Sequence, residues 1–288
     1  LMVRMLDTRQ DTLPPKHRYV QHMRCSGENM AAVKRLMNER DMCSKKLQAL
    51  EREKASASRL QAHRLELCQI SNQVRVLSGI VKASILGSWF EAFERERSDK
   101  EKYVFFVEHI DVRKALSETM DSIGFEYQYI DGGIKNVDRD KAMFRMQDPE
   151  DPLRVLIASY KTCSLGISFC PGTCYEIFVE LASMPTMMIQ AEKRINRDGA
   201  LRDSHYIWLV LEGTTDENIV RTIQARYRDI KHVVDGERGM AIEFKRLPEF
   251  AETKRAKLDE SQNEPNSEQL IQNLEERQAH VREELLPQ

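Results

Sequence analysis

The stretch Tyr103-Val-Phe-Phe-Val107 decides the fold class, because a short, wholly apolar, β-prone run is typical of a strand covered on both faces. Further β-prone segments follow it, and segments with apolar residues at helical spacing separate them. Alternation of strand and helix predicts an α/β fold with a mainly parallel sheet and helices on both faces, a three-layer arrangement. The expected strands are 125–130, 154–159, 175–180 and 205–211, and the expected helices are 112–123, 137–147, 184–197 and one that starts after 214.

The chain before this region is predicted to be helical. Residues 28–67 contain neither Gly nor Pro, and 73–94 form a second helix that is apolar on one side. The first helix is polar, as expected of an exposed arm or of a helix packed along part of its length. Its basic residues outnumber its acids, which permits phosphate contacts, although such a face is more often simply solvated. These residues are Lys34, Arg35, Arg40, Lys45, Lys46, Arg52, Lys54, Arg59 and Arg64.

The two ends of the chain differ from its centre. Leu13-Pro-Pro-Lys16 forbids a helix and 19–23 can form a short strand, so the first residues read as a connection. Beyond Gly236 the sequence is polar and acidic, as expected of a largely flexible tail. We therefore predict a connector or the end of a preceding lobe, a helical arm with linker helices, an α/β lobe and a disordered tail. Their boundaries are 1–24, 25–98, 99–238 and 239–288.

Composition limits the possible functions. The 288 residues suffice for about two domains, and a net charge of −2 excludes a global basic field of the kind that marks a nucleic-acid binder. The six cysteines form no paired framework, no secretion signal is present, and no metal site is expected. No apolar run of membrane-spanning length is expected either. The chain reads as intracellular, and as an excerpt of something longer because it begins with Leu1.

The stretch Gln190-Ala-Glu-Lys-Arg-Ile-Asn-Arg197 is the main candidate functional motif. In a helix over 184–197, Gln190, Arg194 and Arg197 stand at i, i+4 and i+7 and share one stripe. Arginine offers a planar fork of donors that grips phosphate oxygens in pairs. The alternative is that these arginines are solvated or paired with acids such as Glu192. Because ligands bind beyond the carboxyl ends of parallel strands, Ser159, Asp131 and this helix are expected to share one rim.

Together, residues 73–235 resemble the second RecA-like lobe of superfamily 2 helicases, and more narrowly that of Swi/Snf-type DNA translocases of the fork-remodelling, annealing-helicase branch. Five segments carry the resemblance in the family's order. They are Tyr103–His109 (motif IV), Ile130–Gly132 with Arg139 and Phe144, Val155–Phe169 (motif V), Gln190–Gly199 (motif VI), and Tyr206–Glu217.

The resemblance implies an ATPase motor in which ATP and Mg²⁺ sit on a first lobe and the second lobe closes on them. Arg194 and Arg197 are then the catalytic arginine fingers, and Gln190 is a catalytic residue beside them. Gly166 and Ser168 then face the nucleotide. Double-stranded or branched DNA is the implied partner, held through its backbone, together with the first lobe. The implied DNA-binding residues are Ser159, Lys161, Asp131 and Gly132. In a eukaryote, the implied location is the nucleus.

The sequence departs from the family pattern in the motif itself. Asn196 replaces the usual His, Asp198 an apolar residue and Ala200 the closing Gln, and Asp198 could pair with Arg197. The chain also contains no G-x-x-x-x-G-K-[ST] loop, so it is not expected to hydrolyse ATP alone. Two hypotheses remain: half of an ATPase motor, or a degenerate lobe that binds DNA or a protein without catalysis.

Overall fold

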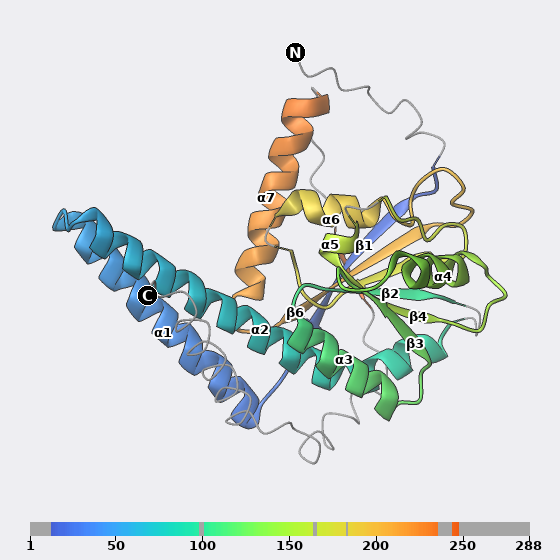
Figure 1. Ribbon diagram of the computed structural model, residues 1–288, viewed down its shortest axis with the longest axis horizontal. Helices are drawn as coiled ribbons and strands as arrows, with labels where there is room; N and C mark the ends of the chain where they lie inside the picture. Colours follow the sequence, from blue (N-terminus) through green and yellow to red (C-terminus); the bar gives the residue numbers. More distant parts are fainter. Residues whose placement is uncertain (1–12, 98–100, 164–165, 183, 236–243, 248–288) are drawn as a thin grey trace.

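A parallel β-sheet forms the centre of the protein, as the sequence predicts (Figure 1). The computed structural model describes residues 13–97, 101–163, 166–182, 184–235 and 244–247. Its strand order is β3-β4-β2-β5-β6-β1-β7, and every pairing is parallel. The strands are β1 Lys16–Met23, β2 Tyr103–Val107, β3 Tyr127–Ile130, β4 Val155–Ser159, β5 Tyr175–Phe178, β6 Ser204–Leu211 and β7 Phe244–Arg246.

Helices cover both faces of the sheet. Alternate residues of β2 point to opposite faces, so Phe105 joins one core cluster and Phe106 the other. The first cluster contains residues of α2 and α3, and the second contains residues of α4, α6 and α7. This arrangement confirms the three-layer prediction. The helices are α1 Gly27–Arg52, α2 Ala57–Arg95, α3 Ile110–Ser122, α4 Asn136–Gln147, α5 Tyr160–Cys163, α6 Pro185–Glu192 and α7 Asp216–Asp235.

The first and last described segments belong to this same sheet. Strand β1 pairs with β6 along its whole length, from Lys16 opposite Ser204 to Met23 opposite Leu211. Residues 16–23 are thus a strand of the lobe itself, where the sequence suggested a connection. Strand β7 pairs with β1 at the edge, so 244–246 are also structured, within a region expected to be tail. Residues 1–12 and 248–288 lie outside the described residues, and the proposed domain boundaries stay predictions.

Helices α1 and α2 form a long antiparallel hairpin that projects from the sheet (Figure 1). The sequence placed the break between the two helices after residue 67, but it lies at 53–56, where Lys54 has a φ of 53°. The predicted boundary is therefore wrong. The hairpin has a narrow apolar seam along α1, which explains how so polar a helix is stable. Its buried residues include Met30, Val33, Leu36, Cys43 and Leu50.

Among the described helices, α2 alone passes the length and hydropathy test for a membrane span, contrary to the expectation that no segment does. Its most apolar window has a mean hydropathy of 1.3, and 78% of that window is buried inside the protein. Phe90 and Phe93 in α2 pack against Tyr103 of β2, with ring centroids 5.0 and 6.1 Å apart. Packing against the sheet accounts for the apolar character of this helix.

A stack of aromatic and histidine rings lies at the start of β6 and includes His205. The ring of His205 lies 4.7 Å from that of Tyr175 and 5.2 Å from that of His17, and burial, with the nearby charge of His17, lowers the pKa of His205 to about 4. Between pH 4 and the ordinary histidine pKa of about 6.5, the unfolded chain therefore binds a proton at His205 that the folded chain does not bind. We expect the free energy of unfolding to fall as the pH is lowered from about 6.5 towards 4.

The measurement is the urea midpoint at several pH values in this window. His205→Phe keeps a stacked ring without a titrating group, so its midpoint should fall less on acidification than that of the unaltered protein. His22→Gln, at an exposed histidine on the same sheet, is the control and should follow the unaltered protein. Equal pH dependence in His205→Phe and the unaltered protein would contradict the assignment.

Candidate functional site

The candidate arginines lie just beyond helix α6 and not within it. Met184 is the N-cap of this helix, and Pro185 occupies the first helical position. The helix ends at Glu192 and the chain continues in turns, with the Arg194 amide bonded to the Ala191 carbonyl at 2.8 Å. The predicted helix over 184–197 is therefore too long, and Gln190, Arg194 and Arg197 do not form the predicted stripe on one helix.

The side chain of Asn196 gives a physical reason for this early end. Its amide nitrogen donates to the Pro14 carbonyl at 2.9 Å and to the Ser204 hydroxyl at 3.3 Å. These contacts tie the chain to the start of β1 and β6. Gly199, with a φ of 96°, then reverses the backbone in a conformation that favours glycine.

Arg194 is joined to the segment that resembles motif V. Its carbonyl accepts from the Phe169 amide at 2.9 Å, and its Nη1 donates to the Ile167 carbonyl at 3.1 Å. Ser168, between these two residues, accepts a bond from Gln147 through its own carbonyl, and Gly166 is exposed with a φ of 76°. The residues predicted to face a nucleotide thus lie beside Arg194 on one edge.

This segment is held tightly against the end of α4. A Cβ on Gly172 would lie 2.3 Å from the Met146 carbonyl oxygen, a distance that no side chain tolerates. The Thr173 hydroxyl also donates to Met146 at 3.2 Å. Glycine at position 172 therefore permits the close approach that supports the backbone beneath Arg194.

Arg197 is exposed, and Gln190 is exposed on the last turns of α6. The sequence suggested that two acids, Glu192 and Asp198, could form ion pairs with the arginines. Glu192 instead accepts two bonds from Arg18, at 2.8 and 2.5 Å, and is almost fully buried. No ion pair joins Arg197 to Asp198 within the described part of the chain. The Arg197 guanidinium is therefore available to an anion.

A buried carboxyl group lies beneath this edge. Glu176 on β5 is fully buried, and neither of its carboxyl oxygens has a hydrogen-bond partner. Burial, together with the nearby charge of Glu192, raises the pKa of Glu176 well above its ordinary value. The raised pKa favours the neutral form of this carboxyl group, which compensates less of the positive charge of Arg194 than a carboxylate would.

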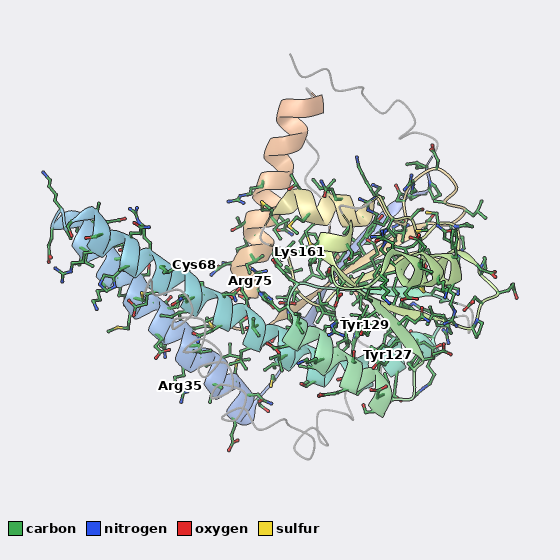
Figure 2. All side chains as sticks on the ribbon, viewed as in Figure 1. Arg35, Cys68, Arg75, Tyr127, Tyr129 and Lys161 are labelled. Atoms are coloured by element: carbon green, nitrogen blue, oxygen red, sulfur yellow. The ribbon has the colours of Figure 1, made fainter. Side chains whose placement is uncertain are left out.

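The residues predicted to hold DNA gather at the opposite edge of the sheet. Ser159 ends β4 and its hydroxyl lies 3.1 Å from that of Thr162, which bonds to the Ile130 carbonyl at the end of β3. Asp131 follows directly and accepts from the Gly133 amide at 2.9 Å, forming a tight turn that leaves Gly132 exposed. Lys161, in the short helix after β4, is also exposed (Figure 2).

The expectation of a single shared rim is wrong. Ser159, Lys161 and Asp131 lie at the carboxyl ends of the strands, whereas Arg194 and Arg197 lie at the amino ends, beside Pro14 and Ser204. The reason is that a helix following a parallel strand runs back along the sheet, so the end of α6 returns to the edge from which β5 started. Two separate groups of candidate residues result.

Sequence reasoning missed a polar network at the carboxyl edge. Buried Glu180 accepts from the amides of Glu108 and His109, at 2.7 and 2.9 Å, and from the His109 ring at 2.6 Å. Burial alone raises a carboxyl pKa, but the hydrogen bonds and charge of His109 keep the pKa of Glu180 below its ordinary value. Its position at the end of the predicted strand 175–180 was the available signal. No group of three potential metal ligands occurs in the described residues.

Comparison with known proteins shows that the chain is similar to Swi/Snf-type proteins. No family model matches it. It is 28% identical over 144 residues to SWI/SNF-related matrix-associated actin-dependent regulator of chromatin subfamily A-like protein 1 of Bos taurus, which covers 50% of this chain and 14% of that protein. It is 30% identical over 121 residues to DNA annealing helicase and endonuclease ZRANB3 of Bos taurus, covering 42% and 11%.

A solved structure agrees with these relatives at the level of fold. The C-terminal part of the Fun30 ATPase domain aligns with a TM-score of 0.53 and 13% identity, over 73% of this chain and 89% of that one. The resemblance to the C-terminal lobe of a Swi/Snf-type helicase of the fork-remodelling branch, and the RecA-like fold, are thereby confirmed. The matched part amounts to 11–14% of the length of the two curated relatives named.

Proposed function

We propose that this chain is the second motor lobe of an ATP-dependent DNA translocase or helicase. Arg197 and Arg194 act as arginine fingers on ATP that a first RecA-like lobe holds, with Gln190 beside them. The observation that carries the proposal is the exposed Arg197 guanidinium on an edge where Phe169 and Ile167 fix the neighbouring Arg194. Such cations stabilise the charge that builds on the transferring phosphoryl group.

The residues of this edge fit part of an ATP site. They supply cations and exposed backbone at Gly166, and the motif-V-like segment that also contains Ser168 lies against Arg194. They supply no group of acidic ligands for Mg²⁺ in the described residues. We therefore assign Mg²⁺ and most of the ATP contacts to the first lobe, and the closing cations to this one.

The carboxyl edge is the proposed DNA contact. Lys161 can bind a phosphate, the Ser159 hydroxyl can donate to another, and the Asp131-Gly132 turn brings backbone close to the strand. Contacts of this kind are independent of base sequence and weaken with salt. The separation of the two edges lets nucleotide and DNA bind the same lobe without competing for residues.

The second candidate is a non-catalytic lobe that binds DNA or a protein. One observation favours it: Asn196, which stands where the family has His, is used to anchor the chain at Pro14 and Ser204. A residue committed to such anchoring has little freedom to couple ATP to DNA. The two candidates differ in whether a completed motor turns over ATP.

The test is ATP hydrolysis by the chain joined to a first lobe of the same family. The chain alone should release no phosphate, because it lacks a G-x-x-x-x-G-K-[ST] loop. The joined protein should hydrolyse ATP and do so faster with DNA. A joined protein that binds DNA in a salt-sensitive manner yet remains inactive would favour the non-catalytic lobe.

A further inference from the structure

We infer that the α1–α2 hairpin is a second, separate binding surface for the phosphate backbone of duplex DNA. It lies outside both edges described above, and its function does not require ATP. A row of lysine and arginine side chains on α1 supplies the positive charge. The inference rests on their lack of partners, their geometry along the helix and the place from which the hairpin projects.

Most basic side chains of the hairpin are exposed and have no acidic partner within the described residues. Two of the exceptions are Arg40, paired with Asp41 at 2.6 Å, and Arg64, paired with Glu51 at 2.8 Å. Only a few exposed acids of the hairpin, such as Glu39, lack partners themselves, so the free charge is positive. The basic residues without partners are Lys34, Arg35, Lys45, Lys46, Arg52, Lys54 and Arg59.

Three of these residues form a straight row. Lys34, Lys45 and Arg52 stand at i, i+11 and i+18, so at about 100° per residue they point in nearly the same direction. This direction is about 180° from the buried residues Leu36, Cys43 and Leu50 of the same helix. The row is about 27 Å long at 1.5 Å per residue. It can therefore follow most of one duplex turn of about 34 Å.

The row is held rigidly. Leu50 is buried near the tip and Val33 near the base, so α1 packs on α2 over its length. Arg35, next to the row, lies on the side of α1 away from α2 (Figure 2). Because the helix fixes the spacing of these charges, less ordering of the backbone opposes binding than in a flexible basic tail.

The base of the hairpin adjoins the carboxyl edge of the sheet. Asn72 of α2 lies 3.0 Å from the ring of His109, and Arg75 pairs with Glu108 at 2.5 Å, both just beyond the end of β2. Helix α1 starts shortly after β1 ends at Met23. The hairpin therefore projects beyond the edge where Lys161 lies, and a duplex reaching that edge can continue along the row.

The experiment measures binding of the full chain to a 30-base-pair duplex by fluorescence anisotropy over a range of NaCl concentrations. The variant Lys34→Gln/Lys45→Gln/Arg52→Gln removes the row. The slope of log K against log salt should become less steep by about 2.7, which corresponds to three lost phosphate contacts. Circular dichroism and the urea midpoint check that the exposed substitutions leave the fold unchanged.

The matched control loses the same charge elsewhere. Lys114→Gln/Lys141→Gln/Lys245→Gln changes three exposed lysines outside the hairpin and should leave the slope nearly unchanged. Equal slopes for the row variant and the unaltered chain would overturn the inference, as would equal losses in both variants. Retained duplex binding by the row variant with lost binding to polyglutamate would also overturn it, in favour of an acidic protein. An inactive joined ATPase would leave this binding unchanged, so the two proposals fail separately.

Discussion

Replacing Arg197 by alanine should lower the DNA-stimulated ATPase rate of the joined two-lobe protein about 10³-fold or more. The exposed guanidinium of Arg197 is not tied to Asp198 or Glu192, so it can reach a phosphate presented by a closing first lobe. Its removal leaves transition-state charge without a cation, while the buried residues beneath it stay in place. The measurement is phosphate release at saturating ATP and DNA.

Arg202 provides the matched control, because it lies near the same edge but pairs with Glu101 at 2.6 Å. Arg202→Ala should change the rate by less than about threefold. Arg197→Lys should also be impaired, because lysine keeps the charge but not the planar fork of donors. A rate for Arg197→Ala within about threefold of the unaltered protein would show that this residue is not an arginine finger.

The central strands could be predicted because they are buried on both faces. Every residue of Tyr103–Val107 is buried, and such strands appear in the sequence as apolar runs. The outer strands lack this signal. Strand β1 is mostly polar and half-buried, and β7 is a three-residue strand in an acidic region. The break between α1 and α2 at 53–56 was not predicted, because Lys54 adopts a positive φ and no glycine marks this position in the sequence.

The residue types of the candidate site could be predicted, but their arrangement could not. A local motif identifies Arg194 and Arg197, whereas their distance from Ser159 depends on how far α6 runs back along the sheet. The helix ends at Glu192, and Asn196 just beyond it donates to the carbonyl of Pro14, which is far away in the sequence. The edge on which the arginines lie could have been predicted from the sequence, because a helix after a parallel strand ends near the edge where that strand began.

The burial of two lysines also could not be predicted from the sequence. Nothing in the sequence distinguishes Lys102 from an exposed lysine, yet it is buried and donates to the carbonyls of Arg145, Asp151 and Leu153 at 2.7–2.9 Å. Burial lowers its pKa. These acceptors lie in α4 and in the loop that follows it, and they surround Lys102 only in the folded chain, so they cannot be seen in its local sequence.

Lys82 of α2 is the second buried lysine, and its loss should be the most damaging change to stability. Its Nζ lies 2.7 Å from the Asp216 carboxylate and 3.2 Å from the Leu209 carbonyl, and both charged side chains are almost inaccessible. Asp216 also accepts from the Leu211 amide at 3.1 Å. The pair thus joins the hairpin helix α2 to β6 and to the start of α7.

Lys82→Met keeps the volume of the side chain but leaves the Asp216 carboxylate buried without its cation. We expect the free energy of unfolding to fall by about 3–5 kcal/mol, because desolvation of the remaining charge is no longer offset. Urea unfolding measures this as a lower midpoint at an unchanged slope. Lys114→Met, at an exposed lysine of α3, is the control and should change stability by less than about 0.5 kcal/mol.

The double variant Lys82→Met/Asp216→Asn separates the charge from the packing. Asparagine is neutral and can still accept from the Leu211 amide, so the double variant should be more stable than Lys82→Met alone. That order would show that the isolated carboxylate, and not a lost contact of α2, causes the damage. A double variant less stable than the single one would instead show that the two side chains act independently and that packing dominates. A loss below about 1 kcal/mol in Lys82→Met would mean that water reaches Asp216 in solution, because only a hydrated carboxylate could lose its cation at so small a cost.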